Sequence, residues 1–279
     1  MLTQKKRHLK KRHVIQVVFF VVVAVIAVNH SLVESGLGVS WLSSASLHAI
    51  CPFGGVVTLY QLFTLGTFVQ KIHSSAVILM GIILLMALLF GPVFCGYICP
   101  LGSFQEAIGK MGKRLFKKCY NHFVPKNIDK GLKLLRYVIL ARVVYVTAMS
   151  GYLVFADIDP YNALFSFWTS DVSILSIIVL LTIIVLSLFV ERPWCKYACP
   201  YGAVLGLFNR VSFFKLKRNE ASCIQCKKCD QGCPMNIDIS SQSTVRDLSC
   251  IKCMACTSES DCPVAETVTI APVIWKGAK

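Results

Sequence analysis

Charged residues are scarce in this chain of 279 residues, and acidic residues are the scarcest of them. Asp and Glu number 14 against 29 Lys and Arg, and charged residues make up 15% of the sequence while hydrophobic residues make up 55%. So few charges cannot cover the surface of a soluble protein, which excludes an ordinary soluble domain and predicts that a bilayer solvates part of the chain. The C-x-x-C-H motif of covalent haem attachment is also absent.

Four apolar segments approach the roughly 17 to 25 residues that a helix needs to cross the hydrocarbon core of a membrane. They cover residues 14–28, 75–93, 134–155 and 172–190. A basic run precedes the first segment, as in a signal peptide, but no small-residue cleavage site follows it. We therefore expect an uncleaved membrane anchor.

The basic residues predict how these segments are oriented. Of the 29 Lys and Arg, 27 fall within residues 1–13, 95–136 and 191–279. Because Lys and Arg accumulate on the cytoplasmic side of a membrane, both termini and the middle loop are predicted to be cytoplasmic. A multi-pass protein of the bacterial cytoplasmic (inner) membrane is therefore expected. Since the basic residues lie beside apolar spans, they do not indicate a nucleic-acid partner.

The sequence also repeats itself at a spacing of 100 residues. Segments that begin at Phe94 and Trp194 share the pattern aromatic-C-x-Y-x-C-P-x-G, and Cys-Pro-Phe at 51–53 resembles Asp-Pro-Tyr at 159–161. Each half would then consist of a helix, an outer loop, a second helix and the cysteine motif. The predicted fold is an all-α polytopic membrane protein whose four transmembrane helices form two repeated hairpins about an axis along the membrane normal.

The strongest chemical signal lies near the end of the chain, where eight of the 14 cysteines fall between Cys223 and Cys262. The run from Cys223 reproduces the bacterial ferredoxin motif C-x-x-C-x-x-C-x-x-x-C-P, and the run from Cys250 repeats it with two extra residues. Such runs predict a small α+β bacterial-ferredoxin-like 2[4Fe–4S] tail, in which the two runs exchange their fourth ligands. The expected ligand sets are Cys223, Cys226, Cys229 and Cys262 for one cluster, and Cys250, Cys253, Cys256 and Cys233 for the other.

Other uses of these cysteines fit the pattern less well. Zinc prefers separated C-x-x-C pairs, and disulfides are disfavoured in a cytosolic tail. Lys227, Lys228 and Lys252 stand among the ligands. Their charge would raise the cluster potentials and attract an acidic electron partner, although simple solubility explains them equally well.

Four further cysteines, Cys95, Cys99, Cys195 and Cys199, lie at the predicted inner membrane edge. A proline follows Cys99 and Cys199, so we expect one helix to stop and another to start at each. A helix N-terminus lowers the pKa of a thiol and favours ligand or redox chemistry. If the repeats pair, the four thiols converge, and a third cluster and redox-active thiols are equally compatible alternatives.

A quinol site is a further hypothesis. His48, Cys51 and Asp159 would line a pocket on the outer side, where His48 or Asp159 accepts protons; a structural turn after Cys51 is the simpler interpretation. Arg142 lies within the third span, where charge is costly, so it either pairs with a quinone or another charge or reaches back to the interface. No role is assigned to Cys119.

With both C-x-x-x-C-P motifs and both tail runs, the chain resembles the membrane polyferredoxin family, which includes NapH-type proteins and the carboxy-terminal half of NosR. The resemblance extends from about residue 14 to 275. It implies electron relay between the quinol pool or a cytosolic donor and a partner such as a ferredoxin, cytochrome or flavoprotein, and makes a quinol dehydrogenase component one expectation. Regulation or metalloenzyme maturation, and membrane thiol–disulfide transfer, are the alternatives.

Five regions are expected in chain order. A basic cytoplasmic N-terminus (1–13) precedes the first membrane hairpin (14–110), and a basic cytoplasmic linker (111–133) leads to the second hairpin (134–210). The ferredoxin-like domain covers 211–279.

Overall fold

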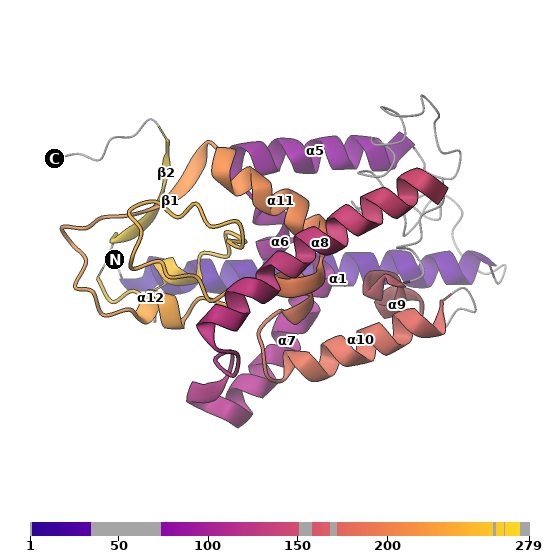
Figure 1. Ribbon diagram of the computed structural model, residues 1–279, viewed down its shortest axis with the longest axis horizontal. Coiled ribbons are helices and arrows are strands. Elements are labelled where there is room, and N and C mark those ends of the chain that lie inside the picture. Colours follow the sequence, from indigo (N-terminus) through magenta and orange to yellow (C-terminus); the bar gives the residue numbers. More distant parts are fainter. Residues whose placement is uncertain are drawn as a thin grey trace.

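The structure is a computed structural model, and it describes residues 2–34, 74–150, 158–167, 172–258, 261–264 and 266–273. This part of the chain is mostly helical, with one small antiparallel sheet (Figure 1). The elements are α1 (Leu2–Glu34), α5 (Ser74–Phe90), α6 (Val93–Tyr97), α7 (Pro100–Phe116), η1 (Lys117–Cys119), α8 (Lys126–Ser150), α9 (Pro160–Ser166), α10 (Ile174–Ser187), the π-helical turn η3 (Trp194–Ala198), α11 (Pro200–Val211), β1 (Phe214–Arg218), α12 (Lys228–Gln231), η4 (Ala255–Thr257) and β2 (Val268–Pro272).

The helices α1, α5, α8 and α10 lie over the four predicted apolar segments. One described helix, Lys11–Val33, is long and apolar enough to cross a membrane, whereas the apolar stretches Leu79–Phe90 and Ile174–Ser187 are shorter. α8 begins at Lys126, earlier than its predicted span, because polar residues extend the helix before the apolar stretch. The predicted end of that span, at 155, lies outside the described residues. Four membrane crossings stay a prediction.

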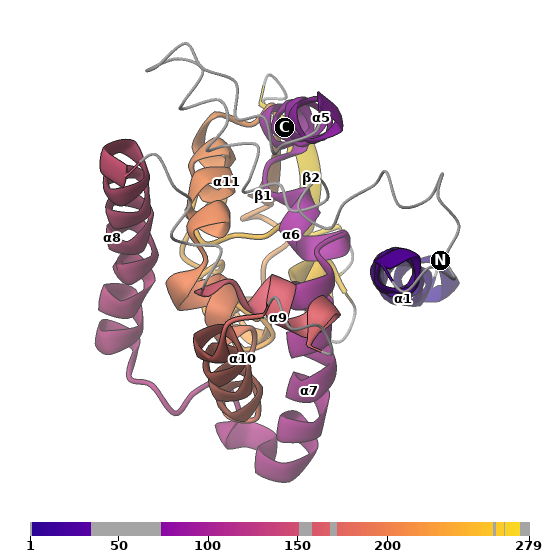
Figure 2. The same cartoon turned by 90° about the vertical axis from the view of Figure 1, so that its right-hand side faces the viewer.

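The exposed faces of these helices are apolar. Val14 on α1 is 61% exposed and Ile174 on α10 is 77% exposed, and large aliphatic side chains of α5 and α8 are exposed as well. Soluble proteins rarely expose apolar patches of this extent. Figure 2 shows α1 and α8 on opposite sides of the central elements, so these apolar faces surround the molecule.

The two halves of the repeat brace each other. α7, which follows the first motif, packs on α10 of the second half, whereas α11, which follows the second motif, packs on α5 of the first. Backbone hydrogen bonds secure the crossing, since Phe213 N donates to Leu88 O at 3.0 Å and Asn121 N donates to Phe189 O at 2.9 Å. At the α7–α10 contact, a Cβ on Gly112 would lie 2.2 Å from the Leu188 carbonyl oxygen. The close contact therefore requires glycine.

The tail lies at one end of the molecule, beside the start of α1 (Figure 1). β1 and β2 pair in antiparallel register, with Leu216 opposite Ile270. The two cysteine runs share a backbone conformation, because the second and fourth residues after the first cysteine have positive φ angles in both. These residues are Gln225 and Lys227 in one run and Lys252 and Met254 in the other.

Candidate metal and redox centres

Two cavities in the tail are each lined by four cysteines. Cys223, Cys226, Cys229 and Cys262 line the first, and Cys233, Cys250, Cys253 and Cys256 line the second. Each cavity has about 330 Å³ of space outside the protein atoms, part of it open to solvent. The structure therefore brings together the two predicted sets, with Cys233 and Cys262 each reaching the cavity of the other run. The assignment of iron to these sets stays a prediction.

The donor chemistry of both cavities fits an iron–sulfur cluster. Burial, with a smaller contribution from neighbouring thiols, raises the pKa of Cys250 to about 11 and that of Cys229 to about 12. Several thiolates so close together in a low dielectric need a positive centre between them, which iron supplies. No three His, Cys, Asp or Glu in the described segments form a single-ion site. Cubane ligands surround a larger four-iron core.

Backbone N–H groups point toward the sulfurs of the second cavity. The amide of Lys252 donates to Cys250, that of Ala255 donates to Cys253, and those of Met235 and Ile237 donate to Cys233. The positive φ of Lys252 and Met254 turns this loop around its sulfurs. Such N–H···S bonds stabilise thiolates and tune the potential of a bound cluster.

The two cavities differ in their surroundings. Cys226 in the first is exposed, whereas all four cysteines of the second are buried in a core that includes Ile83 of α5 and Leu205 of α11. The sulfurs of Cys229 and Cys256 interact electrostatically across the gap between the cavities. The first cavity is therefore the solvent side of the tail and the second is its helix side.

The four inner cysteines converge, as the repeat predicts. Cys99 and Cys199 are the N-cap residues of α7 and α11, which confirms that a helix starts at each. Gly202 N donates to Cys199 Sγ at 3.2 Å, and Gln105 Nε2 lies 3.6 Å from Cys195 Sγ. Burial and the nearby Cys99 sulfur, opposed by Arg192, raise the pKa of Cys195 to about 12.

The inner cysteines touch the second cavity through a glycine. A Cβ on Gly96, the residue after Cys95, would lie 2.5 Å from the Ile251 carbonyl oxygen and 3.3 Å from Cys253 Cα. Only glycine permits this approach, so the first motif lies directly against a loop that lines the second cavity. The equivalent residue of the second repeat is Lys196, whose buried ammonium lies 2.8 Å from an Asp129 oxygen.

A buried ion cluster that the sequence did not reveal holds the two motifs together. Glu106 Oε2 lies 2.5 Å from Arg12 Nη2 and 2.5 Å from Arg192 Nη2. Arg192 Nη1 also donates to the Cys95 carbonyl at 2.6 Å, and Arg12 Nε donates to the Gly96 carbonyl at 3.1 Å. Burial alone would raise the pKa of Glu106, but the two guanidinium groups lower it to about 2.

This cluster changes the interpretation of one predicted topology signal. Arg12 belongs to the basic N-terminus that the charge pattern assigned to orientation, yet its side chain is buried. Arg192 lies two residues before the second motif and is fully buried. Glu106 lies nearly two turns into the helix after the first motif. The only sign of this cluster in the sequence is a charged residue at each of the three positions. That sign does not reveal which charges pair with one another.

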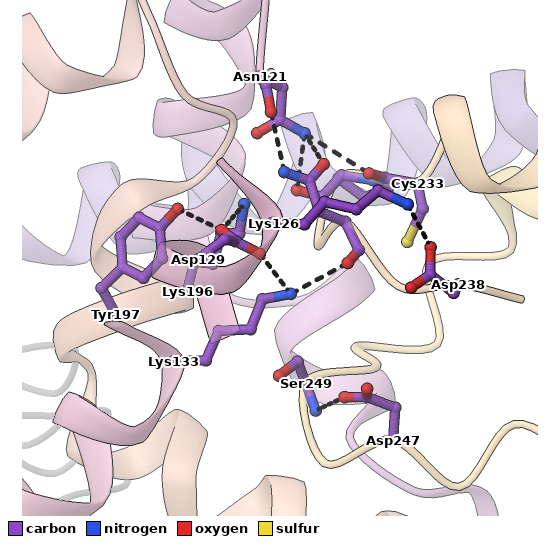
Figure 3. Close-up of polar contacts among 12 residues, drawn as sticks. Asn121, Lys126, Asp129, Lys133, Lys196, Tyr197, Cys233, Asp238, Asp247 and Ser249 are labelled. Carbon is purple, nitrogen blue, oxygen red and sulfur yellow. Dashed lines mark hydrogen bonds and ion pairs between the residues drawn. The ribbon is translucent and has the colours of Figure 1, made fainter. Parts of the chain in front are cut away.

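A second buried cluster fixes the predicted linker against the tail (Figure 3). Asp129 lies 2.7 Å from Lys133 Nζ, and Tyr197 Oη donates to it at 2.6 Å. Lys133 Nζ also donates to the Asn236 carbonyl at 3.0 Å. Because Asn236 follows Cys233 closely in the chain, this cluster ties α8 and the second motif to a loop of the second cavity.

Two more contacts extend the same interface. Asn121 Nδ2 donates to Asn236 Oδ1 at 2.8 Å, and Asn236 Nδ2 donates back to the Asn121 carbonyl at 2.8 Å. Lys126 forms an exposed ion pair with Asp238 at 2.7 Å. The predicted linker therefore includes a docking segment for the tail.

The remaining candidates have varied positions. Asp159 caps α9 by accepting from Tyr161 N at 3.0 Å. Burial is the main cause that raises the pKa of Cys99, and the Asp159 carboxylate adds a small electrostatic contribution in the same direction, so Asp159 is within electrostatic range of Cys99. Arg142 is exposed on α8, and Cys119 is exposed after α7. His48 and Cys51 lie outside the described residues.

The lysines among the tail ligands also differ from one another. Lys227 and Lys228 are exposed. Lys252 is buried, and its Nζ donates to the Phe214 carbonyl at 3.1 Å. Lys252 is therefore not a surface charge for an acidic partner, because its ammonium stabilises the start of β1.

The apolar helices, the ferredoxin-like tail and the cysteine-lined cavities define the class of a membrane-bound iron–sulfur protein. The family model described as "4Fe-4S binding domain" matches residues 72–119 and 172–219, and each range contains one C-x-x-x-C-P motif. No solved structure matches this chain.

Curated relatives specify the class further. "Putative electron transport protein YccM" of Escherichia coli is 31% identical over 79% of this chain and 62% of its own length. "Uncharacterized protein MJ0750" of Methanocaldococcus jannaschii is 34% identical over 63% of this chain and 72% of its own length. "Ferredoxin-type protein NapH" of Haemophilus influenzae is 28% identical over 55% of this chain and 51% of its own length. The chain belongs to the NapH/NosR-like 4Fe–4S membrane protein family, and it spans about 62% of the length of the E. coli relative.

Proposed function

We propose that this protein relays electrons between the quinol pool or a cytosolic donor and a partner redox protein. The observation that carries the proposal is the unbroken series of cysteine sites from the exposed first cavity, through the buried second cavity, to the inner cysteines. Bound [4Fe–4S] clusters would supply one-electron chemistry at these sites. Cys223, Cys226, Cys229 and Cys262 would hold one cluster, and Cys233, Cys250, Cys253 and Cys256 the other.

The chain's own residues serve this relay in three ways. Backbone amides of the second cavity stabilise thiolate charge, and its buried core excludes water from the site. Gly96 brings the first motif into contact with the loop that carries Cys253. Arg192 and Asp129 form buried ion pairs that join the two motifs to each other and to α8, which favours a constant separation of the sites.

The inner cysteines form a third centre in this proposal. Its support is the convergence of the four sulfurs, with Cys95 and Cys195 buried and Cys99 and Cys199 partly buried, and the match of both motif ranges to a model described as 4Fe–4S binding. Arg192 and Gln105 face these sulfurs as positive and hydrogen-bonding partners. Redox-active thiols are the competing interpretation, and they would leave the iron content unchanged when the four cysteines are replaced.

We also propose the membrane arrangement that the sequence predicts. Four spans would form two parallel hairpins, with the termini, the linker and the tail in the cytoplasm and the tail beginning near residue 211. The apolar exposed faces of α1, α5, α8 and α10 support it. Alkaline phosphatase fused after residue 165 should be active and fused after residue 120 inactive; the reverse pattern would contradict the orientation.

Quinol would react on the side of the inner cysteines opposite to the tail. Asp159 supports this because it lies near Cys99, and a carboxylate there is positioned to accept a proton while electrons pass to the thiol centre. Cys51 and His48 would contribute the equivalent position of the first repeat. Arg142 has weaker support, since its exposed side chain suits a reach toward the membrane interface.

The test is reoxidation of the dithionite-reduced protein by a menaquinone analogue, followed by stopped-flow absorbance in lipid nanodiscs. We expect the wild-type protein to be reoxidised rapidly. Asp159→Asn should be reoxidised more slowly at unchanged iron content. The matched control Asp238→Asn, at an exposed tail site, should be reoxidised at the wild-type rate. Clusters that stay reduced while the protein binds a metalloenzyme partner would overturn quinol relay and favour a maturation or regulatory role. Equal rates in both variants would remove Asp159 from the site.

A further inference from the structure

A basic groove opens where α8 and α11 meet the tail. It has about 990 Å³ of space outside the protein atoms, part of it open to solvent, and it is lined by three segments that are distant in the sequence. Its basic lining residues are Lys130, Lys133, Arg136, Arg210 and Arg246, and its acidic ones are Asp238 and Asp247. The groove therefore carries an excess of positive charge.

The acidic residues of the groove are engaged elsewhere. Asp238 pairs with Lys126 at 2.7 Å, and Asp247 Oδ1 accepts from Ser249 N at 2.7 Å. Of the basic residues, Lys133 pairs with Asp129. Lys130, Arg136, Arg210 and Arg246 form no ion pair with another described residue. These four cations outnumber Asp247, the groove carboxylate that forms no ion pair with a described residue, so net positive charge remains for an external anion.

Arg136 is the strongest indication that an anion binds here. Its side chain is buried, with Nη2 donating to Tyr137 Oη at 3.0 Å and to Ser249 Oγ at 3.3 Å. Its Nε is buried without a partner among the described residues. Burying a guanidinium without a carboxylate is costly, and an anion in the groove would offset that cost.

The surroundings of the groove indicate which anion. On α8, Leu134 lines the groove and is 64% exposed, with Val138 exposed one turn further; on α11, Val211 is 65% exposed beside Arg210. Basic residues thus stand directly beside apolar helix faces. A phospholipid has the matching division between an anionic headgroup and apolar chains. Basic pockets between helices on the cytoplasmic side of a membrane bind such headgroups.

We propose that this groove binds the phosphate headgroup of an anionic phospholipid of the cytoplasmic leaflet, with its acyl chains along the exposed faces of α8 and α11. The lipid would join α8, α11 and the tail at one point. The proposal rests on the proposed membrane orientation and not on electron transfer, so iron content and reoxidation rate report separately on the function.

Binding is measured by native mass spectrometry of the delipidated holoprotein with phosphatidylglycerol or phosphatidylcholine. The test variant is Arg210→Gln with Arg246→Gln, because both side chains are exposed and neither is needed to close a buried cluster. The matched control is Lys110→Gln with Arg114→Gln, two exposed cations of α7 outside the groove. We expect phosphatidylglycerol affinity to fall roughly 10- to 30-fold in the test variant and less than about twofold in the control.

Several outcomes would overturn the proposal. Equal losses in both double variants would indicate general surface charge, and equal affinity for the two lipids would remove the headgroup from recognition. Displacement of phosphatidylglycerol by millimolar inorganic phosphate would identify a site for a soluble anion. If the test variant kept the lipid but lost affinity for a reduced electron donor protein, the groove would be a protein-docking surface.

Discussion

Replacing Glu106 by Gln removes the carboxylate that lies between Arg12 and Arg192 while keeping the size of the side chain. Two buried guanidinium groups would then face each other without a counter-charge. Removing one partner of a buried ion pair costs about 3 to 5 kcal/mol of folding free energy. The pKa of Glu106, lowered from 4.5 to about 2, corresponds to a similar free energy of about 3 kcal/mol.

The assay is thermal unfolding of the holoprotein in detergent, followed by the visible absorbance of the clusters. A loss of about 3 kcal/mol should lower the midpoint by roughly 6 to 12 °C. Glu220→Gln is the matched control, because the Glu220 side chain is 68% exposed and its ion pair with Arg218 contributes little. A midpoint for Glu106→Gln equal to that of the control would refute the reasoning.

The pH dependence supplies a second check on the same residue. The pKa of Glu106 is lower in the folded state than in the unfolded chain, so its stabilising contribution is complete above about pH 5. It is lost as the pH falls through 4.5 toward 2. The stability difference between the wild-type protein and Glu106→Gln should therefore shrink over that range. A difference that is constant from pH 6 to pH 4 would show that the ion cluster is not its source.

Three further predictions concern the contacts between tail and motifs. Gly96→Val should force the motif away from the Ile251 carbonyl and slow reduction of the inner centre at unchanged tail iron, whereas Gly81→Val, with nothing within 4 Å of its Cβ, should not; rapid-freeze EPR would measure both. Asp129→Asn should cost about 3 to 5 kcal/mol in denaturant titrations by leaving buried Lys196 unpaired. Chelation of iron should unfold the tail and leave the helical circular dichroism largely intact, because metal binding is coupled to folding at such sites.

The tail illustrates what spacing predicts well. Three cysteines within seven residues have few ways to surround one centre, so the sets that line the cavities followed from the sequence. The helix starts at Cys99 and Cys199 were also predictable from neighbouring residues alone, since proline restricts the conformation of the residue before it. The exchange of α7 and α11 between the halves was not predictable, because it depends on surfaces that meet only after folding.

The buried ion clusters show the same limit. More than eighty residues separate Arg12 from Glu106, and more than eighty separate Glu106 from Arg192. In the sequence, each of these residues looks like a solvent-exposed or topology-determining charge. Asp129 likewise lies in a basic stretch that the sequence predicts to be a linker. Only the packed structure shows that burial and pairing convert these charges into contacts that position the motifs.

We propose that the eight tail cysteines and the four inner cysteines hold three redox clusters. The amounts of iron and acid-labile sulfide per chain test this proposal most directly. Three cubanes predict about twelve of each in the anaerobically purified protein, and about eight after Cys95, Cys99, Cys195 and Cys199 are all replaced by Ser. Mössbauer spectra of the two samples should differ by one [4Fe–4S] component. Fewer than about eight iron atoms in the wild-type protein, or equal iron in both samples, would contradict the account.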